Sequence, residues 1–541
     1  CLPKTAWPPT CSDWGFKGYV MSDWGAVNDR VRGLKAGLEL EMPSSGGAND
    51  ALIVAAVKDG SLKEEILDQA VERILRIIFE YVDHRAPQEF TMEKDHEEAR
   101  HIAEESMVLL KNDENILPLK TSEKVAFIGG FAKKPRFQGG GSSHINCFKV
   151  TNALDSVPSD AQVTYAEGFP DDKDLYDDAQ VAEALKAAKE ADKAVIFAGL
   201  PDNFESEGYD RSHMRLPDCQ LRLIDQILRV QPNTVIVLHN GSPVEMPWLS
   251  DVKGLLEAYL GGQAGGAAVA NILYGKVNPS GKLAETMPLK LSDNPSYLNF
   301  GGGEKVEYRE GVFVGYRYYD TSLVRFQYPF GYGLSYTEFA YSALKADENG
   351  VQFTVTNVGE RDGAEVAQFY IGLPDSAVFR PGKELKGFQK VFLKAGESKT
   401  VHIPFDDKTF RYWNVKTGRW EVEEGEYLIM VGACVADIRL SGKLWIAGTT
   451  SKMPYEKEKL PSYYSGLINN VGAEEFETLL GHPAPSGKWQ GELELNDAIC
   501  QMYYAKSRLA RLVYRILADK KKKSEEVGGQ AVLGRQRLWS T

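Results

Sequence analysis

The chain of 541 residues carries 63 Lys and Arg against 76 Asp and Glu, a formal net charge of −13 at pH 7. At roughly 150 residues per domain, this length suggests two to four domains, and an apolar content of 43% allows each domain a hydrophobic core. The acidic balance argues against a general nucleic-acid-binding protein, which needs basic surface to displace counterions. No apolar run is long enough for a membrane-spanning helix.

The six cysteines are spread along the chain and form no CxxC pair. Their density is far below that of a disulfide-stapled protein, and the histidines do not cluster with them at zinc-ligand spacing. The N-terminal residues include neither an initiating Met nor an apolar segment of signal-peptide length. We therefore expect reduced structural thiols, a cytoplasmic location and no metal, in a chain that is an internal fragment.

The first region, residues 1–83, has the pattern of an α/β repeat. Short apolar segments predict strands over 18–23 and 37–42, and helices are predicted over 28–36, 49–58 and 62–79. Strand, helix, strand and helix in succession are typical of an α/β fold. Two strands cannot close a sheet by themselves, so this region is expected to be incomplete.

A linker is expected over 84–98 and a long helix over 93–111, leading into a second region, residues 99–337. Its predicted strands are 125–130, 194–200, 234–240 and 255–260, and its predicted helices are 178–190, 219–230 and 265–274. Apolar runs bounded by Gly or Asn suit strands that are covered on both faces. The pattern therefore predicts a three-layer α/β/α sandwich.

The third region, residues 338–447, changes to short strands separated by turns. Strands are predicted over 352–357, 365–372, 400–404, 420–422, 427–431 and 438–444, and the pair Asn349-Gly350 favours a hairpin turn. Several strands at this spacing predict an immunoglobulin-like or fibronectin-like β-sandwich.

Residues 448–541 form a C-terminal extension with a basic helix predicted over 497–523. We interpret this helix as docking on the body of the protein, with the lysine run 520–523 in solvent. A helix on a membrane surface is the alternative. The residues after 523 are expected to be disordered.

A carboxylate followed by an aromatic residue ends the first predicted strand, in the segment Ser22-Asp23-Trp24-Gly25. In α/β barrels, catalytic groups lie at the carboxyl ends of the strands. The Trp24 ring can stack on the C–H bonds of a sugar while the Asp23 carboxylate acts at the anomeric carbon. Alternatively, Asp23 caps the helix that follows, and spacing alone favours neither interpretation.

A second acidic segment follows the predicted strand 194–200. Asp202, Glu205, Glu207 and Asp210 lie within nine positions, next to Arg211. Like charges at this density raise one another's pKa, as a general acid requires. On the residues alone, a solvated acidic loop is the slightly favoured alternative.

Two glycine-rich segments, residues 128–131 and 138–143, invite comparison with phosphate-binding loops. Neither contains GxGxxG or GxxxxGK[ST]. We interpret both segments as tight turns near a ligand cleft.

Five segments, in order along the chain, resemble those of glycoside hydrolase family 3, the β-glucosidase family. They are SDWG (22–25), FESEGYDR (204–211), NGSPVEMPW (240–248), GVFVGYRYY (311–319) and YPFGYGLSY (328–336). The segment PGKELKGF (381–388) resembles the signature of the fibronectin-type domain of that family. The resemblance covers about residues 13–444. The probability that this many ordered segments agree by chance is very small.

The resemblance implies an α/β plus all-β protein: the remnant of a (β/α)8 barrel, an α/β/α sandwich and a fibronectin type III-like sandwich. By the motif match, Asp23 is the nucleophile and Trp24 lines the sugar subsite. The acid/base comes from the loop with Glu205 and Glu207, and Glu207, directly before Gly208, is preferred. The family's barrel has most of its residues ahead of the nucleophile segment, whereas few precede that segment in this chain.

The implied activity is retaining hydrolysis that removes terminal β-D-glucosyl or related residues by double displacement. Retention requires the two carboxyl groups ~5–5.5 Å apart. The implied partner is a small-molecule carbohydrate, with no cofactor, nucleic acid or membrane span. β-Xylosidase and α-arabinosidase stay open as alternatives, whereas an N-acetylglucosaminidase of the family is disfavoured because its acid/base is a barrel His–Asp pair. The alternative from another class is a catalytically incomplete fragment that binds carbohydrate or serves as a scaffold.

Overall fold

The computed structural model describes residues 15–87, 89–170, 172–207, 210–300, 306–484, 493 and 499–526. These residues fall into two compact units. The first contains the residues up to Phe90 together with those between Gly491 and Lys521, and the second is built mainly from Thr91–Gln490.

The first unit contains three helices near its N-terminal end, α2 (Arg30–Lys35), α3 (Ala48–Lys58) and α4 (Glu64–Asp83). They confirm the three predicted helices to within a few residues. The helices share a small hydrophobic core formed by Leu34, Ile53, Ala56, Leu62 and Ala70.

The two strands predicted in the first unit do not form. The segments 18–23 and 37–42 meet in a single parallel bridge, Met21 with Leu40. A parallel ladder is stable when neighbouring strands and covering helices bury it on both sides, and none of the described sheets includes these segments. A few backbone hydrogen bonds and two side chains join the segments instead. The Ser22 hydroxyl accepts from the Met42 N–H at 2.8 Å, and the Glu39 carboxylate accepts from the Val20 N–H at 2.7 Å.

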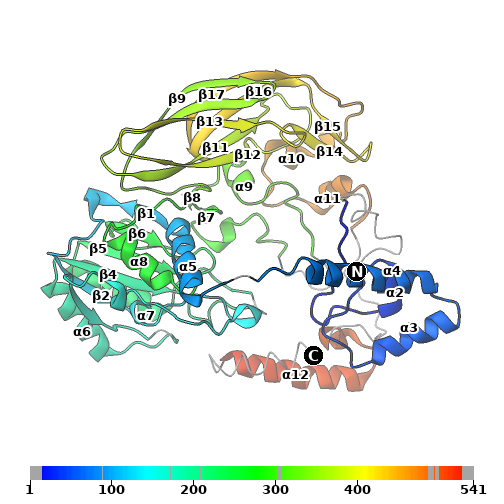
Figure 1. Ribbon diagram of the computed structural model, residues 1–541, viewed down its shortest axis with the longest axis horizontal. Helices are drawn as coiled ribbons and strands as arrows, with labels where there is room; N and C mark the ends of the chain where they lie inside the picture. Colours follow the sequence, from blue (N-terminus) through cyan, green and yellow to red (C-terminus); the bar gives the residue numbers. More distant parts are fainter. Residues whose placement is uncertain are drawn as a thin grey trace. The chain divides into compact units, whose positions relative to one another are not determined.

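The α/β part of the second unit is a six-stranded sheet with the order β1-β6-β5-β4-β2-β3 (Figure 1). Its strands are β1 (Val108–Asn112), β2 (Lys124–Ile128), β3 (Gln162–Ala166), β4 (Lys193–Gly199), β5 (Thr234–His239) and β6 (Gly254–Glu257). All neighbours are parallel except β1, which pairs antiparallel with β6.

Helices cover both faces of this sheet, as the apolar strands predict. The helices are α5 (Met92–Ser106), α6 (Asp178–Glu190), α7 (Asp218–Val230) and α8 (Gly265–Leu273). On β4, Ile196 belongs to the core that includes residues of α6 and α7, whereas Val195 and Phe197 belong to the core that includes residues of α5 and α8. The three-layer sandwich is therefore confirmed.

The long helix predicted over 93–111 is wrong at its C-terminal end. Helix α5 ends at Ser106, and the chain continues as β1. The run Met107-Val108-Leu109-Leu110 is almost completely buried, and it gains ladder hydrogen bonds as the antiparallel edge strand beside β6. Strand β3 was not predicted, because as the other edge of the sheet it lacks a continuous apolar run.

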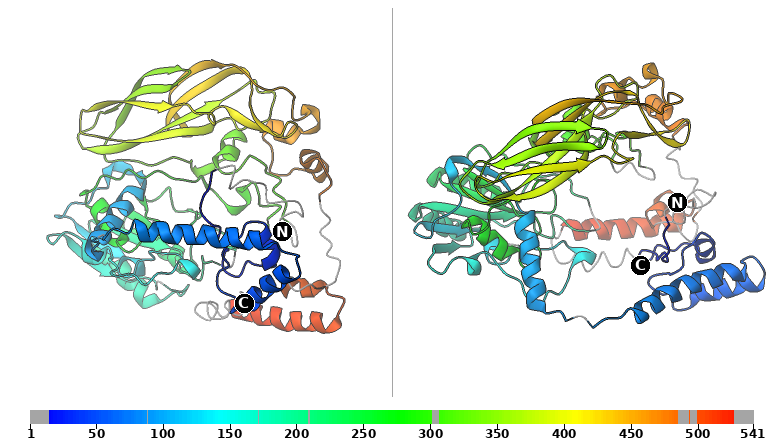
Figure 2. Two further views of the ribbon diagram at one scale, coloured as in Figure 1. Left: turned by 45° about the vertical axis from the view of Figure 1, so that its right-hand side comes forward. Right: turned by 45° about the horizontal axis from the view of Figure 1, so that its top comes forward.

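The next part of the second unit is a β-sandwich, drawn in yellow-green to orange in both views of Figure 2. One sheet has the order β13-β10-β9 and the other the order β12-β11-β16-β17. The strands are β9 (Phe339–Asp347), β10 (Gly350–Asn357), β11 (Gly363–Gly372), β12 (Glu384–Leu393), β13 (Ser398–Pro404), β16 (Gly425–Cys434) and β17 (Asp437–Ile446), with a small hairpin of β14 (Arg411–Asn414) and β15 (Arg419–Val422). All six predicted strands are confirmed, and β9, β12 and β14 are additional.

Two short helices, α10 (Pro461–Ser465) and α11 (Ala473–Leu480), follow the sandwich. Farther along, α12 (Arg508–Glu526) starts later and ends later than the predicted basic helix. Of the apolar positions on which the prediction of docking rested, Leu509, Leu512 and Ile516 are at least half exposed in this helix. The prediction of disorder at the C-terminus falls mainly on residues 527–541, outside the described residues. Among the described helices, none is long and apolar enough to cross a membrane.

Candidate functional site

Asp23 and Trp24 lie in an exposed turn of the first unit. The Asp23 carboxylate accepts a hydrogen bond of 2.7 Å from the backbone N–H of Trp24, and the Trp24 side chain is 66% exposed. The residue that caps α2 is Asp29, which accepts from the backbone N–H of Arg32. The interpretation of Asp23 as a helix cap is therefore wrong, and its carboxylate is free of that structural task.

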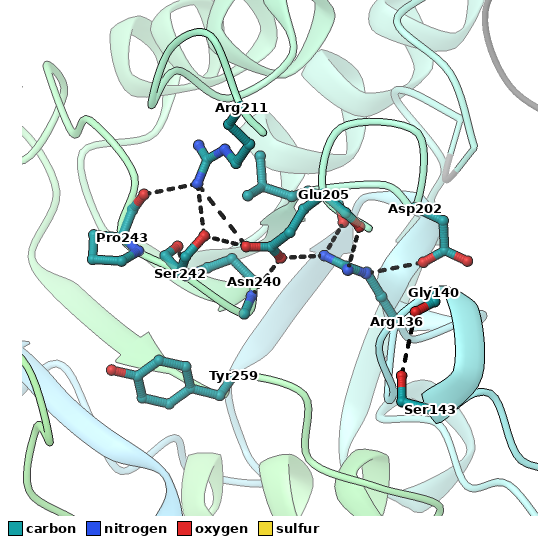
Figure 3. Close-up of polar contacts among 12 residues, drawn as sticks. Arg136, Gly140, Ser143, Asp202, Glu205, Arg211, Asn240, Ser242, Pro243 and Tyr259 are labelled. Carbon is teal, nitrogen blue, oxygen red and sulfur yellow. Dashed lines mark hydrogen bonds and ion pairs between the residues drawn. The ribbon is translucent and has the colours of Figure 1, made fainter. Parts of the chain in front are cut away.

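The acidic loop begins where β4 ends, at the carboxyl edge of the parallel sheet, where open α/β sheets bind their ligands. A buried arginine, Arg136, holds the base of the loop (Figure 3). Its guanidinium donates to the carbonyl of Leu200 at 2.8 Å, the carbonyl of Glu205 at 2.9 Å and the Glu205 carboxylate at 2.7 Å, and it pairs with Asp202 at 3.1 Å. One side chain thus ties three positions of the loop together.

Glu205 is enclosed by hydrogen-bond donors. Besides Arg136, the backbone N–H of Gly241 donates to its carboxylate at 2.7 Å, and the Ser242 hydroxyl donates to the other oxygen. Burial alone would raise the pKa of Glu205, but the hydrogen bonds from Ser242, Arg136 and Gly241 outweigh it and hold the pKa below the usual value. Glu205 is therefore held as a carboxylate and serves as an anchor of the loop.

Glu207, two residues later, has a different environment. Its side chain is exposed, and one oxygen, Oε2, accepts from both the backbone N–H and the hydroxyl of Ser142, at 2.6 Å each. These two hydrogen bonds hold the pKa of Glu207 below its usual value. The expectation that crowded carboxylates raise one another's pKa is thus wrong for both Glu205 and Glu207, because donors from other segments stabilise the charged forms.

Two further carboxyl groups, which the sequence did not single out, lie near Glu205. Glu257, at the end of β6, is completely buried and accepts from the backbone N–H of Tyr259 and the side chain of Asn240. Burial raises the pKa of Glu257 well above its usual value, and it also raises that of Glu285, which accepts from the Tyr259 hydroxyl at 3.0 Å. The position of Glu257 at the carboxyl end of a parallel strand was the available signal.

A cavity of about 660 Å³ adjoins this cluster in the second unit. Its lining includes Arg211, Ser242, Glu285, Arg317 and Tyr319. The second unit thus brings together the acidic loop, the Asn240-Gly241-Ser242 segment and the glycine-rich turn before Ser142. Asp23 and Trp24 belong to the first unit, whereas Glu205 and Glu207 belong to the second.

We expect Arg136→Ala to lower the free energy of unfolding of the α/β part by about 3 kcal/mol, because the change removes one partner of a mostly buried ion pair. It removes the Arg136 donor from the Leu200 carbonyl and, among the described residues, the only ion-pair donor closer than 4.0 Å to the Glu205 carboxylate. That carboxylate keeps its bonds from Gly241 and Ser242. Chemical denaturation monitored by circular dichroism measures this loss. The matched control is Arg229→Ala, which breaks an exposed pair with Asp225 and should cost less than about 1 kcal/mol.

The difference in unfolding free energy between the original chain and Arg136→Ala should depend on pH. The Glu205 pKa is lowered in the folded state, so its contribution to stability is complete above the ordinary glutamate pKa of about 4.3. That contribution is lost as the pH falls through the folded-state pKa. The difference between the original chain and Arg136→Ala should therefore narrow on acidification below about pH 4, and a constant difference would exclude the Arg136–Glu205 pair as its source.

Family models match two parts of the chain. The glycosyl hydrolase family 3 C-terminal domain matches residues 107–336, and the fibronectin type III-like domain matches residues 365–434. These ranges fall on the α/β sandwich and on the β-sandwich, so the two fold assignments are confirmed.

Curated relatives are similar over most of this chain. Thermostable beta-glucosidase B of Acetivibrio thermocellus is 51% identical over 452 residues, which cover 81% of this chain and 60% of that protein. An exo-alpha-(1->6)-L-arabinopyranosidase of Bifidobacterium longum is 45% identical over 445 residues, covering 79% of this chain and 58% of that protein. The chain therefore spans about three fifths of the length of these relatives.

A solved structure extends the similarity to the fold. The crystal structure of the Bifidobacterium adolescentis GH3 beta-glucosidase matches with a TM-score of 0.78 at 43% sequence identity, covering 84% of this chain and 69% of that chain. With both family models matching at the predicted places, the chain belongs to glycoside hydrolase family 3.

Proposed function

We propose that the protein is a retaining glycoside hydrolase that removes terminal β-D-glucosyl residues from oligosaccharides or glycosides. The observation that carries this proposal is the 51% identity to a beta-glucosidase over 452 residues, a span that includes most of this chain. In the mechanism, the Asp23 carboxylate attacks the anomeric carbon and the bond to the aglycone breaks. The aglycone departs, and the sugar stays bound to Asp23 as a covalent glycosyl ester. Water then releases the sugar with retention of configuration.

Glu207 is the proposed acid/base. In the first step its carboxylic acid donates a proton to the leaving oxygen, and in the second its carboxylate accepts a proton from water. Its exposure and its attachment to Ser142 through Oε2 leave Oε1 available for this exchange. Glu205 suits the role poorly, because both of its oxygens accept hydrogen bonds from surrounding residues.

Trp24 is proposed to bind the sugar. Its indole ring is largely exposed directly beside Asp23, and an aromatic face matches the C–H bonds on one side of a pyranose. No cofactor enters the scheme, since carboxylates can stabilise the oxocarbenium-like transition state.

Residues 1–83 are proposed to be the C-terminal part of a (β/α)8 barrel, joined by a linker over 84–98 to the sandwich domains 99–337 and 338–447 and to the extension 448–541. An uncovered apolar surface on α4 supports this proposal. The exposed side chains there are Val71, Leu75, Ile77, Ile78, Phe79, Tyr81 and Val82. An apolar surface of this extent is typical of an element that packs against further protein.

A second candidate substrate is an α-L-arabinopyranoside. It is favoured by the 45% identity to an exo-alpha-(1->6)-L-arabinopyranosidase. Both candidates require the same two carboxyl groups, so they differ in sugar recognition and share the proposed mechanism.

Hydrolysis of aryl glycosides tests the proposed function. The 541-residue chain is compared with the extended enzyme, which we define as the same chain lengthened at its N-terminus by the residues encoded upstream. Both proteins are assayed on aryl β-D-glucosides and aryl α-L-arabinopyranosides. We expect the extended enzyme to hydrolyse the glucoside with retention. If the extended enzyme is active and the 541-residue chain is not, the 541-residue chain is a catalytically incomplete part of the enzyme. If a folded extended enzyme hydrolyses neither glycoside, the proposal is wrong and the scaffold alternative stands.

A further inference from the structure

The glycine-rich turn of residues 139–143 lies against the segment with Glu207, although about 65 residues separate them in the chain. Ser142 donates from both its backbone N–H and its hydroxyl to Oε2 of Glu207. This double contact fixes one carboxylate oxygen and leaves the other unconstrained by Ser142.

The glycines of the turn provide the space for this contact. A Cβ atom on Gly141 would lie 2.6 Å from the Cβ of Glu207 and even closer to its Oε2, and Gly141 has a φ of +84°. A Cβ atom on Gly140 would lie 2.5 Å from the Ser206 hydroxyl oxygen. At distances under 3.0 Å a neighbouring atom must shift. A side chain at Gly141 would therefore displace Glu207 itself, whose Cβ is among the close atoms, whereas one at Gly140 would first displace the Ser206 hydroxyl.

The same stretch of chain also holds the beginning of the loop. Arg136 precedes the turn by a few residues and binds the carbonyls of Leu200 and Glu205. One continuous segment, residues 136–143, therefore supports the acidic loop at its base through Arg136 and near Glu207 through Ser142, Gly140 and Gly141.

We propose that this segment, the loop scaffold 136–143, positions Glu207 for reaction, with Ser142 as the residue that orients its carboxyl group. The inference rests on the proposed function, in which Glu207 is the acid/base. Two donors on Oε2 hold the carboxyl group in one orientation and leave Oε1 for the proton exchange. They also stabilise the carboxylate form that accepts a proton from water in the second step, so their contribution to the first step is the orientation of the acid. Small displacements of such a group are costly, since ~1 Å can reduce a rate ~100-fold.

The test uses Ser142→Ala in the extended enzyme. We expect kcat/KM for cellobiose, whose leaving group needs a proton, to fall about tenfold, because the oriented acid is lost in part. For a dinitrophenyl β-glucoside, which leaves without a proton, kcat/KM should stay within about twofold. Ser142→Thr keeps the hydroxyl and should restore the cellobiose value. An equal fall on both substrates, or no fall on either, would overturn the proposal.

Two further variants make the result specific. Ser250→Ala removes an exposed hydroxyl that contacts its neighbour Asp251, and both substrates should be hydrolysed as by the unmodified enzyme. Gly141→Ala should reproduce the selective loss on cellobiose, since its methyl group would displace Glu207.

Hydrogen exchange provides a measurement that does not depend on activity. In the 541-residue chain, amides of residues 202–207 should exchange faster in Ser142→Ala than in the unmodified protein, and unchanged exchange there would contradict the scaffold. Glu207→Ala, measured in parallel, separates the two proposals. If Glu207→Ala discriminates between the substrates and Ser142→Ala does not, the scaffold fails and the function stands. If Glu207→Ala does not discriminate either, both assignments fail.

Discussion

Replacing Asp23 with Ala is expected to reduce hydrolysis of an aryl β-glucoside by the extended enzyme by at least about 10⁴-fold, because the change removes the nucleophile on which the covalent intermediate forms. The remaining carboxyl groups cannot take over, since a nucleophile must lie in line with the departing group. The loss should appear in kcat/KM for all leaving groups alike, because every substrate passes through attack by Asp23. Initial rates with a series of aryl glucosides measure it.

The surroundings of Asp23 make this a test of chemistry. The Asp23 side chain is exposed and bonds to the adjacent Trp24 N–H, so its removal should leave the folded state intact. Asp50→Ala, another exposed carboxylate of the same unit, in the first turn of α3, is the matched control and should retain the original activity. If Asp23→Ala keeps activity within about tenfold of the unmodified enzyme, Asp23 is not the nucleophile.

The second large effect concerns Glu207→Ala. We expect hydrolysis of cellobiose to fall by about 10²–10⁴-fold, the usual contribution of a positioned general acid. A dinitrophenyl glucoside should be affected much less in the first step, because its leaving group departs as an anion. Azide should restore turnover of the activated substrate and yield the glycosyl azide, since an anion needs no base to attack the intermediate.

Glu205→Ala is the counterpart that discriminates between the two carboxylates. Its loss removes the carboxylate that pairs with the buried Arg136 and that accepts from the Ser242 hydroxyl, so the α/β part should become less stable. Its activity should show neither azide rescue nor strong dependence on the leaving group. The reverse result, with both signatures in Glu205→Ala and near-normal cellobiose hydrolysis by Glu207→Ala, would exchange the two roles.

The sequence predicted the interior of the α/β sandwich well, because β4 and β5 are apolar runs buried on both faces and their pattern needs no long-range information. It failed at the edges of that sheet. The helix predicted over 93–111 included most residues of β1, because nothing in the local sequence marks its end. Their strand conformation depends on pairing with β6, about 150 residues later in the chain. In the first unit, the predicted strands met in one bridge because no strand of the described residues flanks them.

The candidate site shows the same division between local and long-range information. The acidic loop was visible in the sequence, since Glu205 and Glu207 follow an apolar strand directly. The sequence did not reveal the donors that determine the state of these carboxylates. Arg136 and Ser142 precede the carboxylates that they bind by more than 60 residues. Their contacts lower the pKa values of both Glu205 and Glu207, whereas carboxylate crowding alone predicted an increase.

The central claim, retaining catalysis through Asp23, is tested most directly by trapping the covalent intermediate. The extended enzyme is incubated with a 2-deoxy-2-fluoro-β-glucosyl fluoride, digested with a protease and mapped by mass spectrometry. The account predicts one fluoroglucosyl group per chain, on the peptide that contains Ser22-Asp23-Trp24-Gly25, and no labelling of Asp23→Ala. Labelling of Glu205, Glu207 or another carboxylate, or persistent labelling of Asp23→Ala, would contradict it.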